Sequence, residues 1–202
     1  GAAAPPAHAA DDSPLAPYAW LIGVWTGKGE APGMGAYTDE YLYEWTMDRR
    51  FMKTTYVMRV GDKIAWTDVG MVGWDAARGC MVGFNFGMEG SIGWGRTIED
   101  STAESFLMEG RVVGPDHNQD FRVRMTRTGP DSLDVVMLSK QGDTYVPQPK
   151  QSYVRKGSGQ MDPSVEPDAP APPEGLKTLA PLAGTWAGTA TDAAGKKLAV
   201  ET

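Results

Sequence analysis

Thirteen residues decide the expected fold: Leu15-Ala16-Pro17-Tyr18-Ala19-Trp20-Leu21-Ile22-Gly23-Val24-Trp25-Thr26-Gly27. A short apolar turn leads into the pattern Gly-x-Trp-x-Gly, which begins the first expected strand. Glycine permits a sharp bend and a close approach between two backbones. The indole of Trp25 is large enough to close one end of a barrel.

Alternating apolar and polar residues continue from this segment to about Lys156. The stretch FRVRMT at residues 121–126 is typical, because apolar side chains occupy its odd positions and polar ones its even positions. Turn-forming pairs such as Gly61-Asp62 separate the segments. The expected strands are Leu21–Gly27, Tyr37–Met47, Phe51–Arg59, Ile64–Trp74, Met81–Phe86, Ser91–Ile98, Glu104–Val112, Phe121–Thr126, Leu133–Ser139 and Lys150–Arg155.

About ten consecutive strands with short connections form a meander. A meander of this length avoids exposed edge strands most simply by closing on itself. We therefore predict an all-β fold, a closed antiparallel up-and-down barrel of about ten strands with a short apolar turn before the first. A β-sandwich is the alternative, and it more often needs longer crossing connections.

Composition divides the chain into four parts. Residues 1–13 are small and Pro-rich, as mature chains often are after removal of a signal peptide, and residues 14–156 form the barrel. Residues 157–175 are a Pro-rich linker. Residues 176–202 read as an incomplete second copy of the barrel entrance, since six of thirteen positions in 176–188 repeat those of 15–27. This copy is expected to dock on its own barrel, to pair with another chain in a homodimer, or to begin a further domain.

Charge and composition exclude several classes of function. The net charge of −7 gives no electrostatic reason to bind nucleic acid. No stretch approaches the roughly 18 consecutive apolar residues of a membrane-spanning helix. The N-terminal composition favours export to the periplasm or the medium, and a disordered cytoplasmic extension is the alternative. Cys80 is the only cysteine and is expected to be an inert buried thiol.

The ordered motifs resemble the calycin superfamily of lipocalin-like barrels, and more closely a bacterial family of uncharacterised lipocalin-like domains. The matching pieces are the Gly-x-Trp turn, Asp48-Arg49-Arg50-Phe51-Met52, Gly70-Met71-Val72-Gly73-Trp74-Asp75 and the closing Tyr153-Val154-Arg155-Lys156. In calycins an arginine of the last strand packs on the tryptophan of the first. The resemblance therefore implies a structural closure made by Gly23, Trp25 and Arg155.

The chain is also distantly similar to nitrobindins, ten-stranded barrels that hold haem through a histidine. It lacks that histidine, because His8 lies in the N-terminal tail and His117 in the turn at 114–118. We therefore expect no haem and no other cofactor.

Catalytic and metal-binding signatures are missing from the sequence. Two distant histidines and one cysteine do not make a conventional zinc site. No nucleophile elbow is present, and a catalytic triad would have to recruit His117. The acidic group Asp39, Glu40, Glu44 and Asp48 reads as solvated. An enzyme on this barrel would need carboxylates and tyrosines as acid–base groups, and no such pair is evident.

The lumen is what remains as a candidate site. Eight strands leave a lumen that side chains just fill, so ten are expected to leave room for a ligand. Methionine suits adaptable apolar pockets, and Arg96 would place a cation at the mouth if it pointed inward. The residues expected to bind a small apolar or amphipathic ligand are Tyr41, Tyr43, Trp45, Met52, Tyr56, Met58, Phe84, Trp94, Met108, Met125 and Met137, with Phe106 beside them. The alternative is a packed core in a non-enzymatic module that self-associates through residues 176–202.

Overall fold

The computed structural model describes residues 13–31, 33–99, 101–157, 187–191 and 197–201. The chain forms two compact units, Gly1–Pro167 and Asp168–Thr202. The predicted tail up to residue 12, the linker from residue 158 and the repeated Gly-x-Trp frame around Trp186 lie outside the described residues. Within those described, no helix is long and apolar enough to cross a membrane.

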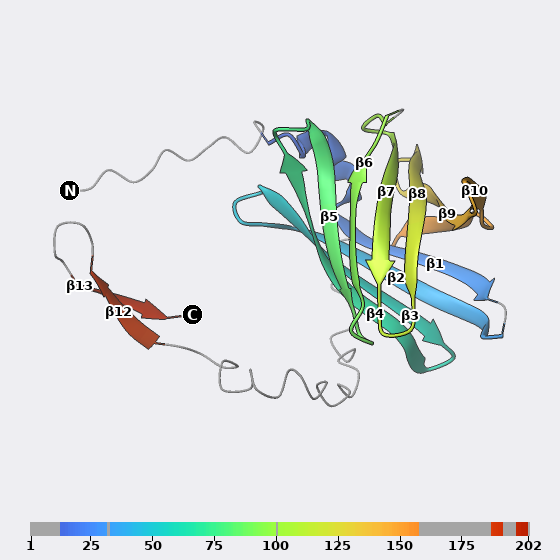
Figure 1. Ribbon diagram of the computed structural model, residues 1–202, viewed down its shortest axis with the longest axis horizontal. Coiled ribbons are helices and arrows are strands. Elements are labelled where there is room, and N and C mark those ends of the chain that lie inside the picture. The colour runs from blue at the N-terminus through green and yellow to red at the C-terminus, as the bar shows by residue number, and fades with distance from the viewer. Residues whose placement is uncertain (1–12, 32, 100, 158–186, 192–196, 202) are drawn as a thin grey trace. The chain divides into compact units, whose positions relative to one another are not determined.

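The first unit is built almost wholly of strands, which Figure 1 shows side by side with alternating directions. A short 3-10 helix, η2 (Ala16–Leu21), precedes them. The strands are β1 (Gly23–Ala31), β2 (Gly35–Thr46), β3 (Phe51–Val60), β4 (Lys63–Asp75), β5 (Cys80–Gly87), β6 (Ile92–Thr97), β7 (Ser105–Val113), β8 (Asn118–Gly129), β9 (Ser132–Gln141), β10 (Thr144–Pro147) and β11 (Gln151–Arg155).

Ten of these strands close into an antiparallel barrel. Each strand from β1 to β9 pairs with the next, and β11 bridges the two ends of the meander. In β11, Arg155 is opposite Trp25 of β1 and Tyr153 is opposite Leu133 of β9. The predicted fold class is therefore confirmed, and no edge of the main sheet is left open over these pairings. The short β10 was not predicted and extends the outer end of β9, where Tyr145 pairs with Lys140.

One end of the barrel is filled by a dense apolar core. Helix η2 covers this end, and its Leu21 is buried together with Trp25, Met52 and Phe106. Each such side chain contributes roughly 1.5–3 kcal/mol when it is fully buried. The Trp25 indole Nε1 donates a hydrogen bond of 2.7 Å to the carbonyl of Leu21, which ties the helix to the first strand.

The second unit contains an antiparallel pair of strands, β12 (Ala187–Thr191) and β13 (Lys197–Glu201). Ala187 is opposite Glu201 and Thr191 is opposite Lys197. In the barrel, Thr26 is opposite Glu40 and Glu30 is opposite Ala36. Adding 161 to each number of the barrel pairs gives the pairs of this hairpin, so the two hairpins share one register.

Candidate functional site: the barrel lumen

A cavity of about 390 Å³ lies among the strands of the barrel. This volume falls in the range of small-molecule pockets, about 300–1,000 Å³. Its wall is apolar and aromatic apart from a small polar group, and it consists of Leu21, Tyr41, Tyr43, Met52, Thr54, Tyr56, Asp68, Val72, Met81, Gly83, Phe84, Asn85, Trp94, Gly95, Phe106, Met108, Val112, Phe121, Val123, Met125, Val135, Met137, Gln151 and Tyr153.

The cavity is closed at the η2 end and opens toward the other. Along the inner face of β9, Leu133 is 2% exposed, whereas Met137 is 39% exposed. Phe106 on β7 is 1% exposed, and farther along that strand Val112 is half-buried. A ligand would therefore enter at the end where Met137 and Val112 lie, and its deepest atoms would meet Phe106 and Met52.

Glycines on the inner face of the wall leave room for this cavity. A Cβ atom on Gly83 would contact Met108 Cε at 3.5 Å and Val72 Cγ2 at 3.7 Å, so position 83 faces the lumen. Gly70 on β4 has a different role, because it lies outside the cavity wall and a Cβ there would approach Thr54 Oγ1 to 2.5 Å, so this glycine permits close packing of the neighbouring strands. The glycines of the cavity wall are Gly83 on β5 and Gly95 on β6, where a larger side chain would occupy part of the space.

Nine of the eleven predicted lumen residues line the cavity, and two do not. Trp45 packs against the core of the closed end, with the Arg49 guanidinium 5.2 Å from its ring centroid. Met58 lies opposite Asp39 and Trp66, next to a register shift at Arg59. Both residues share the inward parity of their strands but lie outside the cavity wall.

The prediction that Phe84 and Trp94 point their side chains inward was wrong. They border the cavity, yet their side chains are 53% and 41% exposed on the outer face. The lumen face of β5 and β6 is occupied instead by Gly83 and by Gly93, whose added Cβ would collide with the Asn85 side chain. Alternation on these strands is inverted, because small and polar residues face in while aromatic ones face out. Arg96 is likewise exposed, so it places no cation at the mouth.

Sequence reasoning placed Tyr41 and Tyr56 in the lumen but missed Asp68, which forms a polar row with them on the inner wall. Tyr41 of β2 is opposite Tyr56 of β3, which is opposite Asp68 of β4. The rings of Tyr41 and Tyr56 lie 4.5 Å apart between centroids. Asp68 shares the parity of Val72 in its own strand, and this alternation could have identified it.

Asp39 is a second inward carboxylate, and it lies behind this row. It is only 1% exposed and accepts hydrogen bonds from the Tyr153 hydroxyl at 2.8 Å and the Tyr56 hydroxyl at 3.1 Å. Burial raises the pKa of Asp39, and the two tyrosine hydroxyls oppose that rise. Reading Asp39 as part of a solvated acidic group was wrong, because position 39 has the inward parity of Tyr41 and Tyr43.

Asp68 is the charged residue of the cavity wall. Its Oδ2 accepts a hydrogen bond of 3.2 Å from the Trp66 indole. Burial raises its pKa to about 6, and the nearby Glu89 carboxylate also raises it. The negative charge of Asp68 in turn raises the pKa values of Tyr41 and Tyr43, after the larger effect of their burial.

The closure predicted from the resemblance is present. The Arg155 Cζ lies 4.1 Å from the Trp25 ring centroid, and Trp25 is fully buried. Gly23 has a φ of +124°, and a Cβ there would approach Arg155 Nη1 to 2.8 Å. A glycine at position 23 therefore satisfies both the backbone conformation and the space that the guanidinium needs.

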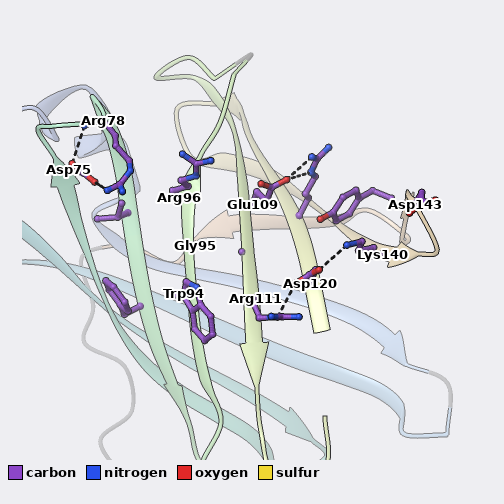
Figure 2. Close-up of a pocket in the computed structure, with 15 residues that line it drawn as sticks. Asp75, Arg78, Trp94, Gly95, Arg96, Glu109, Arg111, Asp120, Lys140 and Asp143 are labelled. Carbon is purple, nitrogen blue, oxygen red and sulfur yellow. Dashed lines mark hydrogen bonds and ion pairs between the residues drawn. The ribbon is translucent and has the colours of Figure 1, made fainter. Parts of the chain in front are cut away.

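The outer wall carries a second, more polar hollow of about 860 Å³, shown in Figure 2. Its charged side chains largely neutralise one another. Arg111 and Lys140 both contact Asp120, at 3.0 Å each, and Arg122 contacts Glu109 at 2.6 Å. Exposed ion pairs of this kind contribute about 0–1 kcal/mol each and leave little unmatched charge for a ligand. The lumen is the better candidate site.

Comparisons with known proteins agree with the fold. No protein-family model matches the chain, and no curated protein matches it. The structure is similar to the crystal structure of Rv2717c from M. tuberculosis, with a TM-score of 0.55 and 16% sequence identity, over 71% of this chain and 97% of that one. At this identity the likeness concerns the fold alone, a closed antiparallel β-barrel.

Proposed function

We propose that this protein binds a small, largely apolar ligand inside its barrel. The observation that carries the proposal is the cavity of about 390 Å³, closed by η2 at one end and open at the other. Its wall combines flexible methionines with tyrosines, and a small-molecule site typically joins an apolar surface to a few placed polar groups.

The alternative of a merely packed core is less consistent with this wall. A packed barrel interior would carry large side chains on every strand, whereas Gly83 and Gly95 border the cavity on β5 and β6. A larger side chain at either position would occupy part of the cavity. A cavity that is open to solvent favours ligand binding over the interpretation of the lumen as a packed core.

Binding is favoured over catalysis. The wall contains a carboxylate, Asp68, with tyrosines near it, but among the described lining residues no histidine, cysteine or lysine accompanies it. A proton-transfer site generally pairs a base with a second acid, nucleophile or metal, and a tyrosine can be that acid. The hydrogen bond to Asp68 comes from the Trp66 indole rather than from a tyrosine hydroxyl. Burial also raises the pKa values of Tyr41 and Tyr43, which makes them poorer proton donors. Asp68 is therefore better explained as a group that orients a ligand.

A titration with the dye ANS tests the proposal. The wild type should bind one dye per chain with a blue shift of its emission. Met125→Trp fills the lumen beside Tyr43 and should abolish that binding, and Val123→Phe, a smaller change on the same strand face, should weaken it. Val154→Trp introduces the same indole at an outer position that is 58% exposed and should leave binding unchanged. Equal binding by all four proteins would place the dye on the outer wall and refute the proposal.

We further infer that residues 176–202 repeat the barrel entrance. The shared register of the β12–β13 and β1–β2 hairpins supports this, together with the repeated Gly-x-Trp-x-Gly frame. We also propose that two chains associate through this segment. From the composition of residues 1–13, we propose that the protein is exported from the cytoplasm after a signal peptide is cleaved. Light scattering of the full chain and of a chain ending at Gly157 tests the association, because it gives the number of chains in each particle. The same number for both proteins would contradict the association.

A further inference from the structure

The charge on the described residues that line the lumen is negative only. Asp68 is the one charged residue among the described residues that line the cavity, and no lysine, arginine or histidine lies among them. No cationic side chain of the described residues pairs with Asp68, whose recorded hydrogen bond comes from the neutral Trp66 indole. A carboxylate in a mostly apolar wall without a cation is unfavourable in the empty protein.

The surroundings of Asp68 reinforce this negative field. Glu89, from the turn between β5 and β6, lies close enough to raise the pKa of Asp68. Both Glu89 carboxylate oxygens are buried with no hydrogen-bond partner among the described residues. Asp39 adds a third carboxylate behind Tyr56. Among the described residues, the side chains that line the cavity from β2, β3 and β4 are thus neutral or carboxylates, and none of them is a cation.

Aromatic faces complete the recognition chemistry. Tyr41 and Tyr56 stand next to Asp68 in the cross-strand row, and Tyr43 lies 5.7 Å from Tyr41 between centroids. The Tyr56 hydroxyl is held by Asp39, which fixes the ring. A cation over the face of a tyrosine is attracted by the ring quadrupole. Carboxylate and aromatic faces together match an ammonium group and repel an anion.

We propose that the lumen selects ligands with an apolar body and a single cationic amine, whose ammonium group lies against Asp68 and the faces of Tyr41 and Tyr56. This inference rests on the proposed function, since it names the chemistry of the ligand for the same cavity. A fatty acid or another anionic amphiphile would place like charge beside Asp68 and Glu89 and would be excluded.

Three probes of equal chain length separate charge from apolar burial: decylammonium, decanol and decanoate, each titrated by calorimetry at pH 7.5. Decylammonium should bind about tenfold or more tightly than decanol, because hydrogen bonds to charged groups are the strong ones. Decanoate should bind more weakly than decanol. Asp68→Asn should remove the preference for the amine and leave decanol binding unchanged.

The control variant accounts for the overall charge of −7, which attracts any cation. Glu44→Gln changes the net charge by the same amount at an exposed position of β2 and should keep the full preference for the amine. If Asp68→Asn does not fold, wild-type protein supplies the test, because decylammonium affinity should fall as Asp68 gains a proton near pH 6 while decanol affinity stays constant.

The outcomes separate the two proposals. Equal affinities for decylammonium and decanol, both lost in Met125→Trp, would overturn the amine inference and keep the lumen as a binding site. An amine preference that Glu44→Gln abolishes as fully as Asp68→Asn would also overturn it. Binding of none of the probes, or binding that Met125→Trp leaves intact, would overturn both.

Discussion

The Arg155 guanidinium lies over the indole of Trp25, with Cζ 4.1 Å from the ring centroid. The same guanidinium donates hydrogen bonds to the carbonyls of Trp20, at 2.7 Å, and Ile22, and it pairs with Asp131 at 2.9 Å. One side chain thereby joins the last strand, the first strand and the covering helix. Lysine at this position would keep the charge but lose the planar fork.

Arg155→Lys should lower the free energy of unfolding by about 2–4 kcal/mol, the sum expected for a buried cation–π contact and two lost hydrogen bonds. Urea denaturation followed by tryptophan fluorescence measures this. Arg124→Lys, on the outer face of β8, should change stability by less than about 0.5 kcal/mol. Equal effects of the two substitutions would mean that Arg155 contributes only its charge.

The outward position of Phe84 predicts an unusually mild substitution for a large aromatic residue. Phe84→Thr should cost less than about 1 kcal/mol and leave lumen binding unchanged, because the side chain is 53% exposed. Phe106→Ala, at a position 1% exposed, should cost about 3–5 kcal/mol. Thermal and urea unfolding of both variants check the prediction. A loss in the free energy of unfolding above about 3 kcal/mol for Phe84→Thr would show that the ring is buried in the core.

Asp68 should make stability depend on pH. Its folded pKa of about 6 lies above its ordinary value of 3.8, so the folded protein holds this proton more tightly than the unfolded chain does. The stabilising contribution is therefore complete below pH 4 and is lost as the pH rises through 6. Asp68→Asn removes the penalty and should be more stable than the wild type by about 1–3 kcal/mol at pH 7.

The same comparison at pH 4 gives the control for that prediction. There the wild-type carboxyl is protonated in the folded protein, so the two proteins should unfold at similar urea concentrations. An Asp68→Asn variant with no gain at pH 7 would mean that a counter-charge already neutralises Asp68. A gain in stability together with a loss of amine affinity would be the expected signature of a binding group.

Asp39 should behave in the opposite way, because it holds two hydroxyl groups. Asp39→Ala removes the acceptor of the Tyr56 hydroxyl and the nearer acceptor of the Tyr153 hydroxyl, which keeps only a long contact of 3.4 Å to Gln151. Each unsatisfied donor costs roughly 1–3 kcal/mol. We expect a loss of at least about 2 kcal/mol by urea denaturation. Glu44→Ala, at an exposed position, should lose less than about 0.5 kcal/mol. Retained stability in Asp39→Ala would show that the tyrosines find water instead.

Local pattern predicted the strands well but not which face each one buries. Strand ends agree within a few residues, since alternation and turn residues act locally. Phe84 and Trp94 were misplaced because a rule that buries large apolar groups does not foresee an inner face made of glycine. The observed register explains it, since Asn85 occupies the space beside Gly93. Asp39 was missed for the converse reason, because the tyrosines that make its burial tolerable come from β3 and β11. Asp68 was missed because the same rule does not expect a carboxylate on an inner face.

By itself the sequence determined the all-β class and the number of barrel strands, and its resemblance to calycins implied the closure by Trp25 and Arg155. The fold class and the strand number follow from alternation and from turn residues. Both signals lie within short stretches of sequence, so they can be read before any tertiary contact is known. Only the tertiary structure decided that a cavity remains and that Tyr41, Tyr56 and Asp68 meet in one row on its wall. Cross-strand register sets which side chains from distant segments become neighbours, and a shift of one residue would have turned this row outward to solvent.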